Sequence, residues 1–318
     1  MNEMDRRRFL RGSALLGIAM AMPGFLAACA KKLVGNGESL RILADARVAA
    51  GSKKGLSVFL GGEDYVSGPP NYVAIGLVRG SGDEIVGDDA RVWMVPTSNP
   101  DDKVAPLGPF DAPWSPFSKP EAAPAPQGMN ALDLTFPTPG TWTMLVETEK
   151  SKLIGSTTFK VKEKSKTSTK IAGEQALPTL TPTVGDHRGV EPICTRTPGC
   201  GMHEITLKDA IASGKPTVFI IATPRFCSSR TCGPNVDELL KLRQDVGDAA
   251  NFIHAEVYVD DKPETVQTQK VSPTFAEWSL PSDPWLFVID AKGSIAKRFE
   301  GPITAAKVGT VLAPLLKG

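Results

Sequence analysis

Residues 40–163 consist of short segments in which apolar and polar positions alternate. The segments are LRILADARV, GLSVFLGG, NYVAIGLVR, ARVWMV, ALDLTF, TWTMLVETE and STTFKVKE, and most are bounded by Gly, Pro, Asp or Asn. In TWTMLVETE, Trp142, Met144 and Val146 share one face, and Glu147 lies on the other. Such alternation is typical of antiparallel strands with one buried face. The pattern predicts an all-β sandwich.

A proline-rich segment, residues 98–128, interrupts the alternation. It holds too much proline for a central strand and is too long for an ordinary loop. Phe110, Trp114 and Phe117 lie in it. These aromatic side chains either cover an edge of the sandwich or form a docking surface on an extended chain. We favour the covering role, because exposed aromatic side chains need a reason and covered ones do not.

From residue 187 onward the element types alternate. KPTVFIIAT and NFIHAEVYVDD read as buried strands, and PWLFVID and SIAKRFEG read as a hairpin joined at 291–293. ITLKDAIASG, GPNVDELLKLRQDV and TAAKVGTVLAPLL have helical spacing, and ETVQTQKVSPTFAEW is a helical or irregular crossing. Strands that alternate with helices predict an α/β sheet. Residues 164–186, rich in Lys, Ser and Thr with two prolines, have the composition of a linker.

The N-terminus has the features of an export signal. A basic stretch precedes an apolar run over 14–26, which is shorter than the roughly 20 residues of a membrane span. DRRRFLR resembles the twin-arginine export signal, and FLAAC resembles a bacterial lipobox. The resemblance implies that residues 1–28 are a signal peptide and that Cys29 carries a lipid anchor. We therefore expect a protein on the extracytoplasmic face of the cell membrane, periplasmic or at the cell surface.

Net charge argues against a nucleic-acid partner. Residues 1–28 contain four arginines and two acidic residues, so their removal changes the formal charge from +1 to −1. A near-neutral chain has no electrostatic basis for binding nucleic acid. The sequence also lacks a phosphate-binding Gly-rich loop and the H-E-x-x-H and G-x-S-x-G motifs.

Apart from Cys29, the chain has four cysteines in two pairs, all in the C-terminal half. Outside the cytoplasm, closely spaced pairs favour disulfides. In PICTRTPGCGMHEI, a turn can bring Cys194 and Cys200 together, so a structural disulfide is our preferred interpretation. The alternative adds His203: the C-x5-C-x2-H array supplies soft ligands for Cu(I), or sulfur and nitrogen ligands for zinc.

The second pair lies in FCSSRTCGPNVDELL. Pro234 predicts that a helix begins there, because proline is favoured in a first helical turn. Cys227 and Cys232 would then lie in the preceding loop. The free N–H groups and dipole of the helix start would stabilise a thiolate at Cys232, and Arg225 and Arg230 add positive charge. We interpret the pair as reactive in redox chemistry, with an inert disulfide as the alternative.

The C-terminal order of elements resembles the thioredoxin-like fold over about 205–318. The resemblance rests on a strand, a cysteine-bearing loop, a helix, a strand ending in VYVDD, and Pro284 before WLFVIDAKGSIAKRFEG. It is strongest to extracytoplasmic, membrane-anchored members. It implies that Cys227 and Cys232 are the redox pair and that the 283–284 peptide bond is cis, with Pro284 facing the cysteines.

The spacing of the pair leaves the attacking cysteine open. The family has Cys-x-x-Cys, and this chain has Cys-x4-Cys. Counting back from Pro234 makes Cys227 the nucleophile, which we favour as the more exposed thiol. Matching CGPN to Cys-Gly-Pro-Cys makes Cys232 the nucleophile and puts Asn235 in its partner's place.

We therefore expect a multidomain protein: an immunoglobulin-like sandwich over 40–163, a linker over 164–186 and a thioredoxin-like domain over 187–318. The expected function is thiol–disulfide exchange on extracytoplasmic partner proteins, without a cofactor. A second hypothesis is copper binding or delivery, because the Cys-x3-Cys-Pro of the Sco copper chaperones is close to Cys-x4-Cys-Gly-Pro here. That family also uses a late histidine, and none follows His254. The third is a non-enzymatic binding module with structural disulfides.

Overall fold

The structure is a computed structural model that describes residues 37–80, 84–97, 104–118 and 126–317, and all of these lie in one compact unit. The predicted signal peptide, residues 1–28, and the predicted anchor residue Cys29 lie outside the described residues. Within the described ranges, no helix is both long enough and apolar enough to span a membrane.

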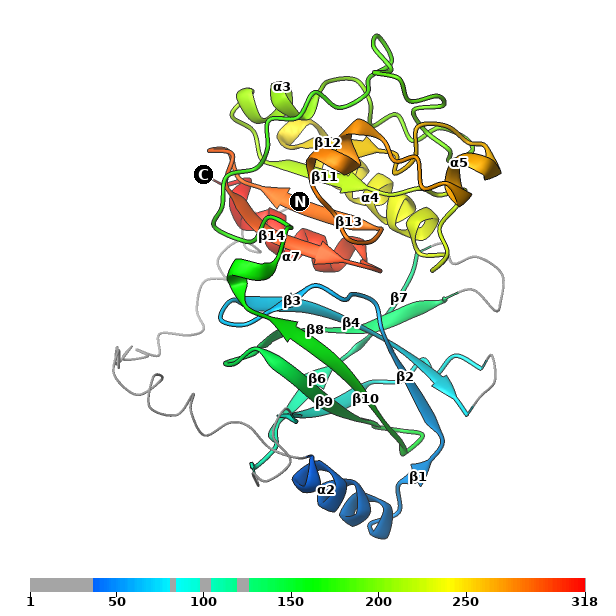
Figure 1. The fold of residues 1–318 in the computed structure, drawn as a ribbon, viewed down its shortest axis with the longest axis vertical. Coiled ribbons are helices and arrows are strands. Elements are labelled where there is room, and N and C mark those ends of the chain that lie inside the picture. Colours follow the sequence, from blue (N-terminus) through cyan, green and yellow to red (C-terminus); the bar gives the residue numbers. More distant parts are fainter. Residues whose placement is uncertain (1–36, 81–83, 98–103, 119–125, 318) are drawn as a thin grey trace, which may run out of the picture. The chain divides into compact units, whose positions relative to one another are not determined.

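The N-terminal half contains two β-sheets with a common core (Figure 1). One has the order β1-β10-β9-β5-β6, with β3 beside β10, and the other has the order β2-β4-β8-β7. The first sheet comprises β1 (Lys53–Lys54), β3 (Tyr65–Val66), β5 (Ala90–Pro96), β6 (Leu107–Ala112), β9 (Gly140–Thr148) and β10 (Leu153–Lys162). The second comprises β2 (Leu56–Leu60), β4 (Pro70–Arg79), β7 (Trp114–Pro116) and β8 (Gly128–Thr135). Trp142, Met144 and Val146 are fully buried between the sheets, as the alternation predicts.

The first predicted strand, LRILADARV, is wrong: this segment lies in helix α2 (Glu38–Ala49). Its Ala, Leu and Arg residues favour a helix, and over nine residues an apolar spacing of three and four is easily read as alternation. The helix packs on the outer face of the first sheet through Leu40, Leu43, Ala44 and Val48, against Trp93, Val95, Leu145 and Ile154.

Helix α2 also changes the environment of Glu147, which we expected on a solvent-facing side of its strand. Arg47 from the helix donates to the Glu147 carboxylate at 3.0 Å from Nε, and Glu147 is only 3% exposed. Burial alone would raise the pKa of Glu147, but the hydrogen bonds from Arg47 and Ser52 outweigh it and lower the pKa. Both faces of this sheet are therefore covered.

The proline-rich segment forms edge strands. Strand β6 pairs with β5 and β7 pairs with β8, each at the end of its sheet. Phe117 is buried and Phe110 packs against the sandwich core. In its described part, the aromatic side chains therefore cover the sandwich, and prolines are tolerated because edge strands leave one side of the backbone unpaired.

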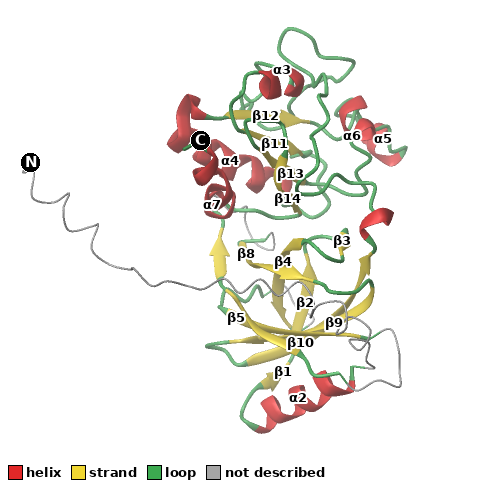
Figure 2. Ribbon diagram, turned by 90° about the vertical axis from the view of Figure 1, so that its left-hand side faces the viewer, coloured by secondary structure: helices red, strands yellow, loops and turns green. Residues whose placement is uncertain are grey.

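The C-terminal half is built on a mixed sheet with the order β12-β11-β13-β14. Strands β11 (Thr217–Ile221) and β12 (Asn251–Ala255) are parallel, and β13 (Trp285–Ile289) and β14 (Ile295–Glu300) form the predicted antiparallel hairpin. Helices α4 (Cys232–Val246) and α7 (Ala305–Leu315) cover one face (Figure 2), and α3 (Leu207–Ala212) packs on the other. Short helices complete this half: η2 (Lys164–Lys166), η3 (Gly247–Ala249), α5 (Pro263–Gln267) and α6 (Pro273–Glu277).

The predicted linker, 164–186, is packed against the C-terminal sheet. The N–H of Gly173 donates to the Ile295 carbonyl, and the N–H of Ile295 donates to the Glu174 carbonyl. Ile171 and Ala176 are buried. Composition indicated a solvated segment, but hydrogen bonding to the hairpin and burial of its few apolar residues hold it in place.

One hydrophobic cluster contains residues of both halves, in addition to the separate core of each half. Tyr72 of β4 packs edge-on against Phe299 of β14, with ring centroids 4.8 Å apart, and its hydroxyl donates to the Pro302 carbonyl at 2.7 Å. Their backbones also meet closely: Gly301 has φ of +80°, and a Cβ there would collide with the carbonyl oxygen of Gly61. Glycine is therefore required at position 301.

A buried carboxylate of the sandwich is neutralised partly by the C-terminal half. Asp64, with a side chain 1% exposed, accepts from Lys162 Nζ at 2.6 Å and from Arg298 Nη1 at 2.8 Å. Burial raises the pKa of Asp64, but the hydrogen bonds from Lys162 and Thr167 and the charge of Arg298 outweigh it, and the net shift is downward. Asp64 is therefore held in its charged form at the junction.

We expect Asp64→Asn to lower the free energy of unfolding at about pH 7 by roughly 3 kcal/mol, because Arg298 would stay buried without its counter-charge. The folded pKa lies below the usual aspartate value of 3.8, so the stabilisation is present above that value and is lost as pH falls through the folded pKa. The difference from wild type should therefore shrink on acidification. Urea unfolding at several pH values measures it.

Asp133→Asn is the matched control. Asp133 also pairs across the two halves, with Lys297, but its side chain is 50% exposed. Exposed pairs contribute less than about 1 kcal/mol. Equal losses for the two variants would show that the buried charge at Asp64 has no special role.

Candidate functional site

Cys227 and Cys232 form a disulfide at the start of helix α4, with Cα atoms 5.9 Å apart. Cys227 lies in the preceding loop and is half-buried, whereas Cys232 is the first residue of the helix and fully buried. We predicted the helix start at Pro234, two residues too late. A proline fits anywhere in the first turn, because the N–H groups there have no partner within the helix; Pro234 occupies its third position.

The helix start is directed at the sulfur of Cys227. The backbone N–H of Cys232 donates to Cys227 Sγ at 3.2 Å, and Ser229 Oγ lies 3.2 Å from the same sulfur. An N–H donor and the positive end of a helix both favour a negative charge. On reduction, the helix start would therefore stabilise a thiolate at Cys227, the loop cysteine. We had predicted this effect at Cys232.

A partly buried acid, Asp283, adjoins the other sulfur. Asp283 Oδ2 lies 3.3 Å from Cys232 Sγ, and the next residue, Pro284, is buried at the start of β13. The 283–284 peptide bond is cis, as expected. Burial raises the pKa of Asp283 to about 6. A group that gains and loses a proton near neutral pH therefore contacts the buried sulfur.

A cavity of about 470 Å³ opens beside this acid, and both halves of the protein line it. The sandwich contributes Phe59, whose side chain is 58% exposed, and the C-terminal half contributes Ser229 and Asp283. An extended chain that reached the disulfide through this cavity would touch both halves.

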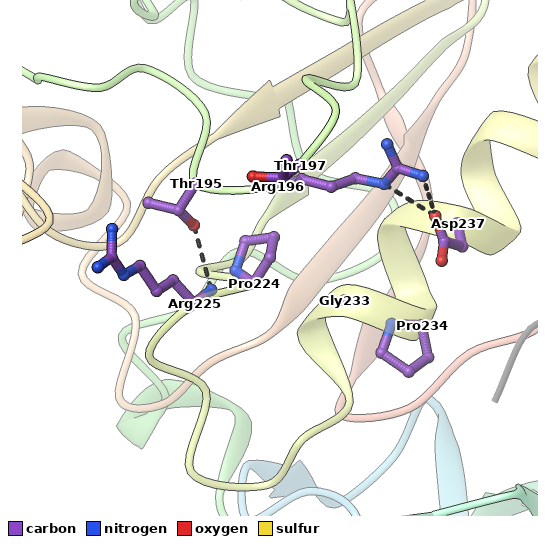
Figure 3. Close-up of a pocket in the computed structure, with 8 residues that line it drawn as sticks. All are labelled: Thr195, Arg196, Thr197, Pro224, Arg225, Gly233, Pro234 and Asp237. Atoms are coloured by element: carbon purple, nitrogen blue, oxygen red, sulfur yellow. Dashed lines mark hydrogen bonds and ion pairs between the residues drawn. The ribbon is translucent and has the colours of Figure 1, made fainter. Parts of the chain in front are cut away.

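A second cavity of about 440 Å³ lies against the first turn of α4 (Figure 3). Arg196 spans it and donates to Asp237 of α4 at 2.8 Å from Nε. Thr195 Oγ1 accepts from the backbone N–H of Arg225 at 3.2 Å. Because Thr195 and Arg196 follow Cys194, this cavity joins the loop of the first cysteine pair to the redox loop.

The disulfide expected between Cys194 and Cys200 is not formed in this structure: the thiols are free and their sulfurs lie 3.6 Å apart. Two imidazoles share their environment. His203 Nε2 lies 3.2 Å from Cys200 Sγ, and His254 Nδ1 lies 3.4 Å from Cys200 Sγ and 3.9 Å from Cys194 Sγ. The hydrogen bond from Cys200 lowers the pKa of Cys194, and the same contact together with burial raises the pKa of Cys200.

Three residues of these sites were not predicted as site residues from the sequence: Asp283, His254 and Glu256. Asp283 precedes the proline that we had singled out, and position alone gave no reason to choose it. His254 and Glu256 lie two positions apart along β12 and the residues after it, and both are buried. Two polar residues on one face of an otherwise apolar strand were the available signal.

The C-terminal half has a thioredoxin-like fold. This conclusion rests on its parallel pair β11 and β12, its terminal hairpin, the disulfide at a helix start and the cis-proline before β13. No protein-family model matches the chain, and no curated protein matches it.

Comparison with solved structures finds several similar proteins, and some of them are named for thiol–disulfide chemistry. A secreted thiol-disulfide isomerase from Corynebacterium glutamicum is 16% identical, covering 36% of this chain and 77% of its own, with a TM-score of 0.28. A thioredoxin-family thiol:disulfide interchange protein from Chlorobium tepidum is 17% identical, covering 45% and 99%, with a TM-score of 0.29. StoA from Bacillus subtilis is 16% identical, covering 43% and 98%, with a TM-score of 0.29.

We expect Asp283→Asn to stabilise the oxidised protein relative to wild type increasingly as pH rises from about 4 to about 7. The folded pKa of about 6 exceeds the usual aspartate value of 3.8, so the stability linked to the protonated acid is fully present below 3.8 and is lost as pH rises through about 6. Asparagine does not ionise and avoids this loss. Denaturant unfolding across this pH range measures the difference.

Asp245→Asn, at an exposed position of α4, controls for the removal of a carboxylate. Its difference from wild type should vary much less over the same range. A pH-independent difference for Asp283→Asn would mean that the acid is not held in an unfavourable environment.

Proposed function

We propose that this protein is an exported, lipid-anchored thiol–disulfide oxidoreductase that acts on extracytoplasmic proteins. The observation that carries the proposal is the Cys227–Cys232 disulfide at a helix start, in contact with the partly buried acid Asp283. The signal-like residues 1–28, with Cys29 as the anchor, support export. The sandwich, for which we propose an immunoglobulin-like fold, would form part of the substrate surface.

In the first step, the thiolate of Cys227 attacks one sulfur of a substrate disulfide. A mixed disulfide forms between Cys227 and the substrate, and the other substrate sulfur leaves as a thiolate. Cys227 suits this role because it is the more accessible sulfur and accepts the Cys232 N–H. Asn235 is an unsuitable partner for Cys232, because its side chain is buried and bonded to Gly301 and Ile303.

In the second step, Cys232 resolves the mixed disulfide. The carboxylate of Asp283 takes the proton of the Cys232 thiol, and the resulting thiolate attacks Cys227 Sγ. The Cys227–Cys232 disulfide forms and the second substrate sulfur leaves, so two electrons have passed from the protein to the substrate. The same steps in reverse order oxidise a substrate dithiol.

The decisive experiment compares serine variants. We expect Cys232→Ser to accumulate a mixed disulfide with a protein substrate through Cys227, because no thiol remains to resolve it. Cys227→Ser should form none, and each variant should lose exchange activity. Non-reducing gels and peptide mass spectrometry identify the trapped species. In the wild type, mild reduction and alkylation should label this pair first.

Ser156→Ala, at an exposed position of β10 that does not line the cavity beside Asp283, is the control and should exchange normally. A trap in Cys227→Ser would make Cys232 the nucleophile. If neither variant loses activity, and Cu(I) uptake by the reduced protein instead depends on this pair, the copper-delivery hypothesis replaces the proposal. The third residue beside the pair is Asp283, and its oxygen is a ligand that Cu(I) does not favour.

We also expect Phe59→Ala to lower kcat/KM for a protein disulfide about tenfold, which corresponds to about 1.4 kcal/mol. Phe59 lines the cavity beside Asp283 with an exposed ring. A small substrate such as glutathione disulfide does not need that contact and should be little affected. Ile42→Ala is the control, since Ile42 is 55% exposed on α2 and does not line this cavity. Equal effects on both substrates would exclude docking at Phe59.

A further inference from the structure

We infer that Cys194, Cys200, His203 and His254 bind one zinc ion in a closed, tetrahedral site. One donor atom from each residue lies within 4.8 Å of all the others. The inference is independent of the proposed exchange chemistry, because the set contains neither Cys227 nor Cys232.

The distances between donor atoms fit such an ion. Zn–S bonds of about 2.3 Å and Zn–N bonds of about 2.0–2.1 Å in a tetrahedron place two sulfurs roughly 3.8 Å apart and a sulfur and a nitrogen roughly 3.6 Å apart. The observed S···S distance is 3.6 Å. Three of the four S···N distances are 3.2, 3.4 and 3.9 Å.

The imidazoles are oriented as zinc ligands. His254 Nε2 lies 3.0 Å from the Ala222 carbonyl oxygen, an acceptor, so Nε2 carries the proton and Nδ1 presents its lone pair to the sulfurs. His203 directs Nε2 at Cys200. Its Nδ1 is buried and has no hydrogen-bond partner among the described residues.

A disulfide explains this arrangement less well. It needs only the two sulfurs, and it would leave Nδ1 of His254 and both ring nitrogens of His203 without a strong partner among the described residues, which is costly. His203 is 3% exposed and His254 is fully buried. Two thiolates and two neutral imidazoles neutralise a Zn²⁺ ion, so the charge is balanced within the protein. Tetrahedral sites of two sulfurs and two nitrogens are typical of zinc, whereas Mg²⁺ and Ca²⁺ prefer oxygen ligands.

The ion would also position the loop between Cys194 and Cys200. Thr195, next to Cys194, donates its N–H to Glu256 at 2.6 Å, and Arg196 reaches Asp237 of α4. Zinc at Cys194 would hold this loop against the first turn of α4 and so shape the cavity of Figure 3.

The test uses the full-length chain, reduced and freed of metal. Zn²⁺ alone is added, and uptake is measured by competition with a chromophoric chelator. We expect one ion per chain in wild type and in the Cys227→Ser/Cys232→Ser control. His254→Gln should weaken binding by roughly 100-fold or more. Because that variant removes a buried side chain, Co²⁺ is also added to wild type, where tetrahedral thiolate ligation gives intense visible bands and a thiolate charge-transfer band.

Three results would overturn the inference. One is a Cys194–Cys200 disulfide, found by peptide mapping of protein purified without reductant, in a chain that holds no zinc. Another is a Co²⁺ spectrum without thiolate charge transfer. The third is zinc uptake that depends on Cys227 and Cys232 and not on His254. If the zinc-loaded wild-type protein has no exchange activity, the proposed function is wrong, and the inference of a zinc site is unaffected.

Discussion

The carboxylate of Glu300 links the sandwich to the segment that carries the redox site. It accepts the backbone N–H groups of Glu63 at 2.9 Å and Asp64 at 2.8 Å, and it accepts Ser282 Oγ at 2.5 Å. Burial raises the pKa of Glu300, so these three donors are needed to keep a carboxylate there. Because Ser282 directly precedes Asp283, the position of the acid beside Cys232 depends on contacts with the sandwich.

The C-terminal half places two cysteine pairs near the start of one helix and gives them different surroundings. Cys227 and Cys232 adjoin a helix start, a carboxylic acid and a cavity lined by both halves. Cys194 and Cys200 adjoin two buried imidazoles and a strand. A backbone N–H donor and an ionisable acid favour a cysteine pair that undergoes redox chemistry. Buried neutral imidazoles favour a cysteine pair that binds a metal ion. The loop through Thr195 connects the two environments.

The hydrophobic pattern predicted secondary structure best where packing against one core determines which positions are apolar. The alternation in β9 and the continuous apolar run of β11 predicted both strands correctly. One face of β9 packs in the sandwich core, and β11 is buried along its whole length, so the burial of each strand follows a simple pattern. The prediction was wrong at α2, where nine residues are too few to separate the two periods. It was incomplete at 164–186, where the hairpin supplies hydrogen-bond partners that composition does not reveal. The start of α4 was misplaced because proline marks a first turn and not a particular position in it.

The sequence by itself determined the chemistry available to this protein: two close cysteine pairs, a helix start next to one of them, a histidine next to the other, and a proline before a terminal hairpin. Each of these features involves residues close together in the sequence, so their spacing along the chain is enough to recognise it. Only the tertiary structure decided that Asp283 meets Cys232 and that His254 joins Cys194, Cys200 and His203. Residues 51, 54 and 60 positions apart along the chain meet because a mixed sheet and its covering helix bring them together. No periodicity within either segment encodes that meeting.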